Sequence, residues 1–145
     1  IKETATEQRK SKQKTVIFKK IINCEREIFH ATLLMRNSIR ESSEANILTQ
    51  QIEPLNTFHQ DVIEQLNQLA KLFKRQPYTS DFAALNASLS KVETTINTVS
   101  PHQTLQIMIN VYSYLFCAKE IVKNIQELAK LATQATSYVT QKIEQ

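Results

Sequence analysis

The chain has 145 residues, the usual size of one domain, and contains no glycine, no tryptophan and three prolines. Glycine normally supplies about 7% of residues and the positive-φ positions of tight turns, so hairpin-rich sheets, phosphate-binding loops and dinucleotide-binding folds are excluded. Hydrophobic residues make up 41% and charged residues 22%, and no apolar run approaches the roughly 18–20 residues of a membrane span. We therefore expect one soluble all-α domain.

The net charge of +4 is concentrated near the start of the chain. Residues 1–20 carry seven Lys and Arg against two Glu, whereas the rest of the chain has a net charge of −1. This basic arm predicts a surface for anionic lipid or nucleic acid, and a solvated helix face is the alternative. The candidate residues are Arg9, Lys10, Lys12, Lys14, Lys19 and Lys20.

The first predicted helix covers about residues 4–41. Apolar positions alternate at spacings of four and three, which is typical of a helix packed against other helices. These positions are Ile17, Ile21, Cys24, Ile28, Ala31 and Met35, and the stripe is widened by Phe18, Ile22, Phe29 and Leu34. Glu41, Ser42 and Ser43 offer a stop and a new N-cap.

The second predicted helix, 54–75, starts with Pro54 in its first turn and ends before Pro77, with basic residues in its last turn. Its apolar seam is Leu55, Phe58, Val62, Leu66, Leu69 and Phe73. The third predicted helix, 80–99, is capped by Thr79 or Ser80 and has Asp81 in its first turn. Its seam is Phe82, Leu85, Leu89, Val92, Ile96 and Val99.

The last predicted helix, 101–143, has a complete start signal. Ser100 is placed as the N-cap, Pro101 as the first helical residue and Gln103 as the partner of a capping box. No helix breaker follows, and the seam continues nearly to the C-terminus. Its residues are Met108, Val111, Leu115, Ala118, Val122, Ile125, Ala129, Ala132 and Val139.

No enzyme or metal signature is complete in this sequence. Glu27 and His30 form one Glu-x-x-His, but a di-iron bundle site needs a second copy and two further inward-facing Glu. The two cysteines, Cys24 and Cys117, lie on apolar seams, so we expect buried free thiols rather than nucleophiles. The sequence predicts no catalytic residue, no metal ligand and no cofactor.

Two phrases, "CEREIFHATLLMRNSIR" in the first helix and "YSYLFCAKEIVKNIQEL" in the last, resemble the cytoplasmic helical domain of fusaric-acid-resistance-type bacterial aromatic-acid exporters. The resemblance covers about residues 17–135, rests on pattern and transfers no functional residue. It implies a soluble regulatory or assembly domain whose ends connect to membrane segments, with the basic arm flanking a span. The four-helix cytokines have a similar outline and would imply a secreted ligand with bridged cysteines.

We predict an antiparallel up-down-up-down four-helix bundle over residues 17–145 with long first and last helices, preceded by a basic helical arm or stalk over 1–16. The excess lengths of the outer helices should project from one end. The expected assembly surface there is Leu128, Leu131, Ala132, Ala135 and Val139, which a polar arm cannot bury alone.

The predicted function is a non-enzymatic, coiled-coil-like interaction module. We expect it to self-associate or to bind a protein partner, in the cytoplasm or at the inner face of a membrane, with no specific nucleic acid and no small-molecule substrate. A secreted cytokine-like ligand, and a lipid- or nucleic-acid-binding module that uses the arm, are the alternatives.

Overall fold

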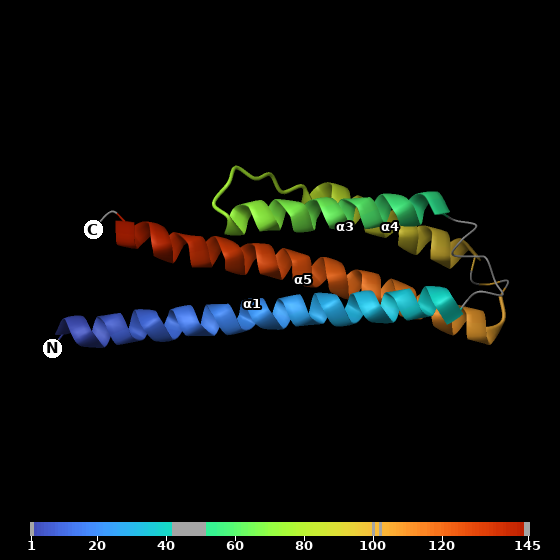
Figure 1. The fold of residues 1–145 in the computed structure, drawn as a ribbon. Helices are drawn as coiled ribbons and strands as arrows, with labels where there is room; N and C mark the ends of the chain where they lie inside the picture. The colour runs from blue at the N-terminus through green and yellow to red at the C-terminus, as the bar shows by residue number, and fades with distance from the viewer. Residues whose placement is uncertain (1, 42–51, 100, 102, 144–145) are drawn as a thin grey trace.

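The computed structural model describes residues 2–41, 52–99, 101 and 103–143, with side chains at 4–39, 53–99, 101, 103 and 104–137. Within this part, the helices are α1 (Lys2–Glu41), α3 (Ile52–Phe73), α4 (Phe82–Val99) and α5 (Leu105–Ile143). Successive helices run in opposite directions (Figure 1). The fold is therefore the predicted up-down-up-down four-helix bundle with long first and last helices.

The core is arranged around α5, which packs against each of the other three described helices and most extensively against α1. Because neighbours surround α5 on three sides, it buries more than one seam, and Tyr114, Ile121 and Ile125 are almost completely enclosed. Predicted seam residues of every helix join this core. They include Ile21, Cys24, Ile28, Leu55, Phe58, Leu69, Leu85, Val92, Ile96, Val111, Leu115 and Ala118.

The prediction that α1 has a widened apolar stripe is wrong. Phe18, Ile22, Phe29 and Leu34 are all exposed. The reason is that α1 packs extensively against α5 alone, and a single neighbouring helix covers only the narrow a/d seam. This one-sided packing leaves large apolar side chains of α1 in water.

The second helix begins two residues earlier than predicted, at Ile52, and Pro54 lies in its first turn as expected. It ends at Phe73 rather than at residue 75, because the chain reverses in a left-handed C-terminal cap. Arg75 has φ of 56°, its N–H donates to the carbonyl of Leu72, and the N–H of Gln76 donates to the carbonyl of Lys71. This is the Schellman pattern, with arginine where glycine is usual.

The connection from α3 to α4 is held against α3 by glutamine side chains. Oε1 of Gln68 accepts the N–H of Thr79 at 2.9 Å, and Nε2 of Gln65 donates to the carbonyl of Asp81 at 3.3 Å. The helix therefore starts later than the predicted caps, Thr79 and Ser80, would place it. Asp81 is the actual N-cap, because its Oδ1 accepts the N–H of Ala84 at 3.0 Å, and α4 starts at Phe82.

The predicted start of the last helix is also wrong. Pro101 lies in a 3₁₀ turn, and α5 begins at Leu105, directly after Thr104. The carbonyl of Thr104 accepts the N–H of Met108 at 3.0 Å, the bond expected of an N-cap residue. Ser100, and the connection over 42–51 where a stop signal was predicted, lie outside the described residues.

The prediction that the outer helices project from one end is correct, but the prediction that the apolar residues near the end of the last helix are exposed there is wrong. The start of α1 and the end of α5 project from the same end of the molecule, beyond α3 and α4 (Figure 1). Leu128, Leu131 and Ala132 are nevertheless buried, and Ala135 is half-buried, whereas the side chain of Val139 lies outside those described. These residues contribute to the core and do not form the exposed assembly surface that we expected.

Candidate interaction surfaces

An apolar groove of about 540 Å³ lies between α1 and α5, at the end of the bundle opposite the termini. One wall comes from Leu34 and Asn37 of α1, and the other from α5. The α5 residues that line it are Ile109, Tyr112, Ser113, Phe116 and Cys117. Because α1 covers only one flank of α5, the groove stays open to solvent.

The exposed face of α5 beside the groove forms a second apolar seam. Leu105, Ile109, Tyr112 and Phe116 follow one another at spacings of four, three and four, so they share one side of the helix. Phe116 is 65% exposed, Leu105 is 73% exposed and Ile109 is 51% exposed. Large apolar side chains clustered in this way on a surface mark a site of association.

The groove is uncharged over its whole length. No Asp, Glu, Lys or Arg occurs between residues 105 and 118 of α5, and none of the α1 residues that line the groove is charged. Our sequence analysis missed this surface because it followed one apolar seam per helix. The signal was the second 4-3-4 spacing on the opposite side of α5.

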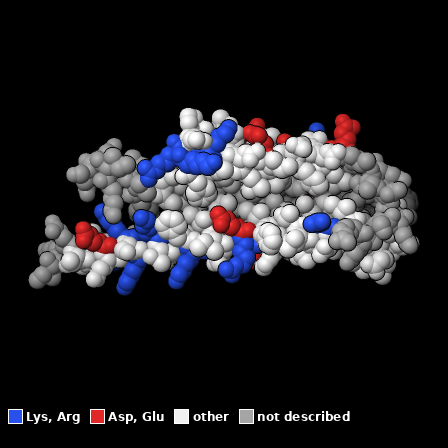
Figure 2. All heavy atoms as spheres, viewed as in Figure 1, with Lys and Arg blue, Asp and Glu red and all other residues white. Residues whose placement is uncertain are grey.

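The structure leaves the predicted basic arm in water. The side chains of Arg9, Lys10, Lys12, Lys14, Lys19 and Lys20 are all exposed, and Nζ of Lys14 lies 5.9 Å from the ring centroid of Phe18. Figure 2 shows further basic side chains at the same end of the molecule, near the end of α3. That second group is Lys71, Lys74 and Arg75, all exposed.

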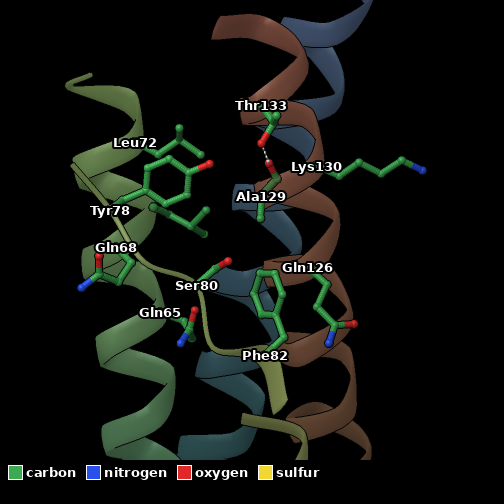
Figure 3. A pocket seen from close by; sticks show the side chains of 11 residues that line it. Gln65, Gln68, Leu72, Tyr78, Ser80, Phe82, Gln126, Ala129, Lys130 and Thr133 are labelled. Atoms are coloured by element: carbon green, nitrogen blue, oxygen red, sulfur yellow. Dashed lines mark hydrogen bonds between the residues drawn. The ribbon is translucent and has the colours of Figure 1, made fainter. Parts of the chain in front are cut away.

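A small pocket of about 230 Å³ lies between the end of α3, the connection to α4 and α5 (Figure 3). Tyr78 and Phe82 lie over α5 here, and Ala129 and Thr133 form the opposite side. The side-chain amides of Gln65, Gln68 and Gln126 already form hydrogen bonds within the chain.

The core contains a polar pair that the sequence did not reveal. Nε2 of His59 on α3 and the hydroxyl of Tyr114 on α5 are 2.8 Å apart. Burial lowers the pKa of His59 and raises that of Tyr114, which keeps both groups neutral near pH 7. The pair lies within the helix packing and joins α3 to α5.

Cys24 and Cys117 are free and buried, as predicted. Burial raises the pKa of both thiols, with nearby carboxylates, such as Glu127 beside Cys24, adding to the effect. Thiols of this kind are poor nucleophiles at neutral pH. Among the described residues, no group of three His, Cys, Asp or Glu side chains is placed to hold a metal ion, and Glu27 and His30 are exposed on α1.

The fold defines this chain as an all-α four-helix bundle. Comparisons with protein-family models, with curated proteins and with solved structures found no significant match. The resemblance to the exporter domain therefore stays a prediction. None of the described helices contains a segment that is both long and apolar enough to cross a bilayer.

Proposed function

We propose that this chain is a non-enzymatic assembly module that pairs with a second copy of itself through the groove between α1 and α5. The observation that carries the proposal is the exposed apolar seam of α5 beside an uncharged groove. Moving these side chains out of water is favourable, at roughly 25 cal/mol for each Å² of apolar surface buried. A helical partner suits the seam because its 4-3-4 spacing is the one that packs helix against helix.

A second copy suits this surface for two reasons. The residues that line the groove carry no charge, so the linings of two copies do not repel each other. The same surface also carries both a ridge, formed by Ile109 and Phe116, and a hollow beside it. Two-fold symmetry is the commonest symmetry of soluble oligomers. A two-fold axis would place the ridge of each copy against the hollow of the other.

Sedimentation equilibrium over a range of protein concentrations tests the proposal. The wild-type chain should approach the mass of a dimer, and a double variant, Ile109→Ser with Phe116→Ser, should remain a monomer. Phe29→Ser with Ile63→Ser is the matched control, since it removes the same two residue types from exposed positions outside the groove. This control should dimerise as the wild type does.

Two results would contradict self-association. One is a wild-type chain that stays monomeric at every concentration, which would leave a different protein as the occupant of the groove. The other is an equal loss of dimer in both double variants, which would place the contact elsewhere on the surface.

A further inference from the structure

The basic residues of this protein are gathered at one end of the bundle. We define the basic pole as the described side chains of residues 4–20, 64–86 and 126–137, which lie at the end carrying both termini (Figures 1 and 2). It has ten Lys and Arg but four Asp and Glu, whereas the other described side chains have five basic and six acidic residues. The charge therefore changes along the long axis of the molecule.

Two groups of residues that are distant in the sequence build this pole. One is the arm of α1, where the basic side chains from Arg9 to Lys20 are exposed and spread over more than one face of the helix. The other is the end of α3, where Lys71, Lys74 and Arg75 surround the left-handed turn. Lys130 on α5 is also exposed. The arm alone is thus only part of the charged surface.

From this arrangement we propose that the basic pole docks the protein end-on to a bilayer that contains anionic lipid. A molecule with its positive charge at one end is oriented by a flat negative surface, and each Lys or Arg near such a surface contributes to binding. Exposed aromatic residues stand beside these charges, namely Phe18, Phe73 and Tyr78. Aromatic rings next to lysines are suited to the headgroup region of a bilayer.

A nucleic acid fits the same pole less well. Single strands are bound by a basic groove with aromatic rings on which successive bases stack. Here the three exposed aromatic residues come from three different segments, and the ring of Phe18 already faces the ammonium group of Lys14. The basic side chains of the arm also spread over more than one face of the helix instead of following one stripe, so they do not outline a path for a strand.

Docking by this pole leaves the opposite end free. The groove between α1 and α5 lies far from the basic pole along the bundle (Figure 1), so a bound bilayer and the partner of the groove do not compete for one surface. The two proposals rest on different residues and can fail separately.

Co-sedimentation with vesicles tests the docking. The full chain should bind phosphatidylcholine vesicles that contain phosphatidylserine, should not bind pure phosphatidylcholine, and should release between about 50 and 200 mM salt. Each of two triple variants should weaken binding by about tenfold or more. One is Lys10→Gln, Lys12→Gln and Lys14→Gln, and the other is Lys71→Gln, Lys74→Gln and Arg75→Gln.

The matched control removes three exposed basic residues outside the pole, Arg26→Gln, Arg36→Gln and Lys91→Gln. It should lower binding much less than either triple variant. Binding that is unaffected by the α3-end variant would overturn the proposal, because the arm alone would then be the surface. Absence of vesicle binding, or displacement from vesicles by a short oligonucleotide at the same salt concentration, would overturn it as well.

Discussion

Arg75 shows how a chain without glycine builds a helix stop. The C-terminal cap of α3 needs a residue with positive φ, and Arg75 adopts 56° although its Cβ makes this region unfavourable by roughly 1–2 kcal/mol. The two cap hydrogen bonds and the tether at Thr79 hold it there. This position was predicted as helix because basic residues suit the last turn of a helix and Pro77 was taken as the stop, and no glycine marked the turn.

Replacing Arg75 with glycine should therefore stabilise the fold. Glycine adopts positive φ without a Cβ clash, so we expect Arg75→Gly to raise the free energy of unfolding by about 0.5–1 kcal/mol. Urea denaturation followed by circular dichroism measures it. Arg75→Ala is the control, since it removes the same charge but keeps the Cβ, and equal stability of the two variants would refute the strain argument.

The buried pair of His59 and Tyr114 predicts a dependence of stability on pH. Burial lowers the pKa of His59 in the folded state, so the unfolded chain binds a proton more readily than the folded chain. The contribution of neutral His59 to the free energy of unfolding is fully present above the unfolded pKa of about 6.5. This contribution declines as pH falls below that value. We expect the free energy of unfolding to decrease from about pH 7 to pH 5.

Substitution of the histidines attributes this loss to one residue. His59→Gln should make the decrease between these pH values smaller, whereas His30→Gln, at an exposed position on α1, should leave it as in the wild type. Denaturation curves at the two pH values provide the comparison. The same decrease in the wild type and in His59→Gln would mean that other groups cause it.

At the scale of the helices, the apolar seams were predictable and the helix starts were less so. The seam of α1 from Ile21 to Ala31 is buried as predicted, since its alternating spacings of three and four depend only on the helix period. The starts of α4 and α5 are displaced by two and four residues, because several capable caps compete. Which cap is used depends on a contact distant in sequence, such as Gln68 holding Thr79.

The cap at Asp81 gives a test at this scale. Asp81→Ala removes the acceptor of the Ala84 N–H and should lower the free energy of unfolding by about 1 kcal/mol. Asp81→Asn keeps a side-chain oxygen and should retain most of the stability. Thr79→Ala and Ser80→Ala should change it much less if Asp81 is the cap, and a larger loss at either position would favour the cap that we first predicted.

At the scale of the whole molecule, the helix lengths and the alternating direction of the helices predicted that the excess lengths of the outer helices, and both termini, lie at one end. The outer helices are about twice as long as the inner ones, and alternation of direction then puts their free ends together. The burial of Leu128, Leu131 and Ala132 could not be predicted in the same way, because it depends on how the other helices pack along α5, which makes its most extensive contact with α1.

The interaction surfaces were predictable only in part. The charge of the arm is evident from residues 1–20, but its extension by Lys71, Lys74 and Arg75 depends on which end of the bundle the end of α3 reaches. The groove needs the same information, since Leu34 and Phe116 are far apart in sequence. The molecule therefore separates a basic end from an end with a groove lined by uncharged residues. Neither surface is the one that we predicted from the apolar residues near the end of the last helix.

Photo-crosslinking from the groove tests the pairing of two copies most directly. Phe116 is replaced by p-benzoylphenylalanine, which keeps an aromatic side chain at this exposed position, and Phe29, 61% exposed outside the groove, carries the same group as control. The account predicts a covalent dimer from position 116, with the cross-link mapped to groove residues of the other copy, and little dimer from position 29. Cross-links only within one chain, or equal dimer yields from both positions, would contradict it.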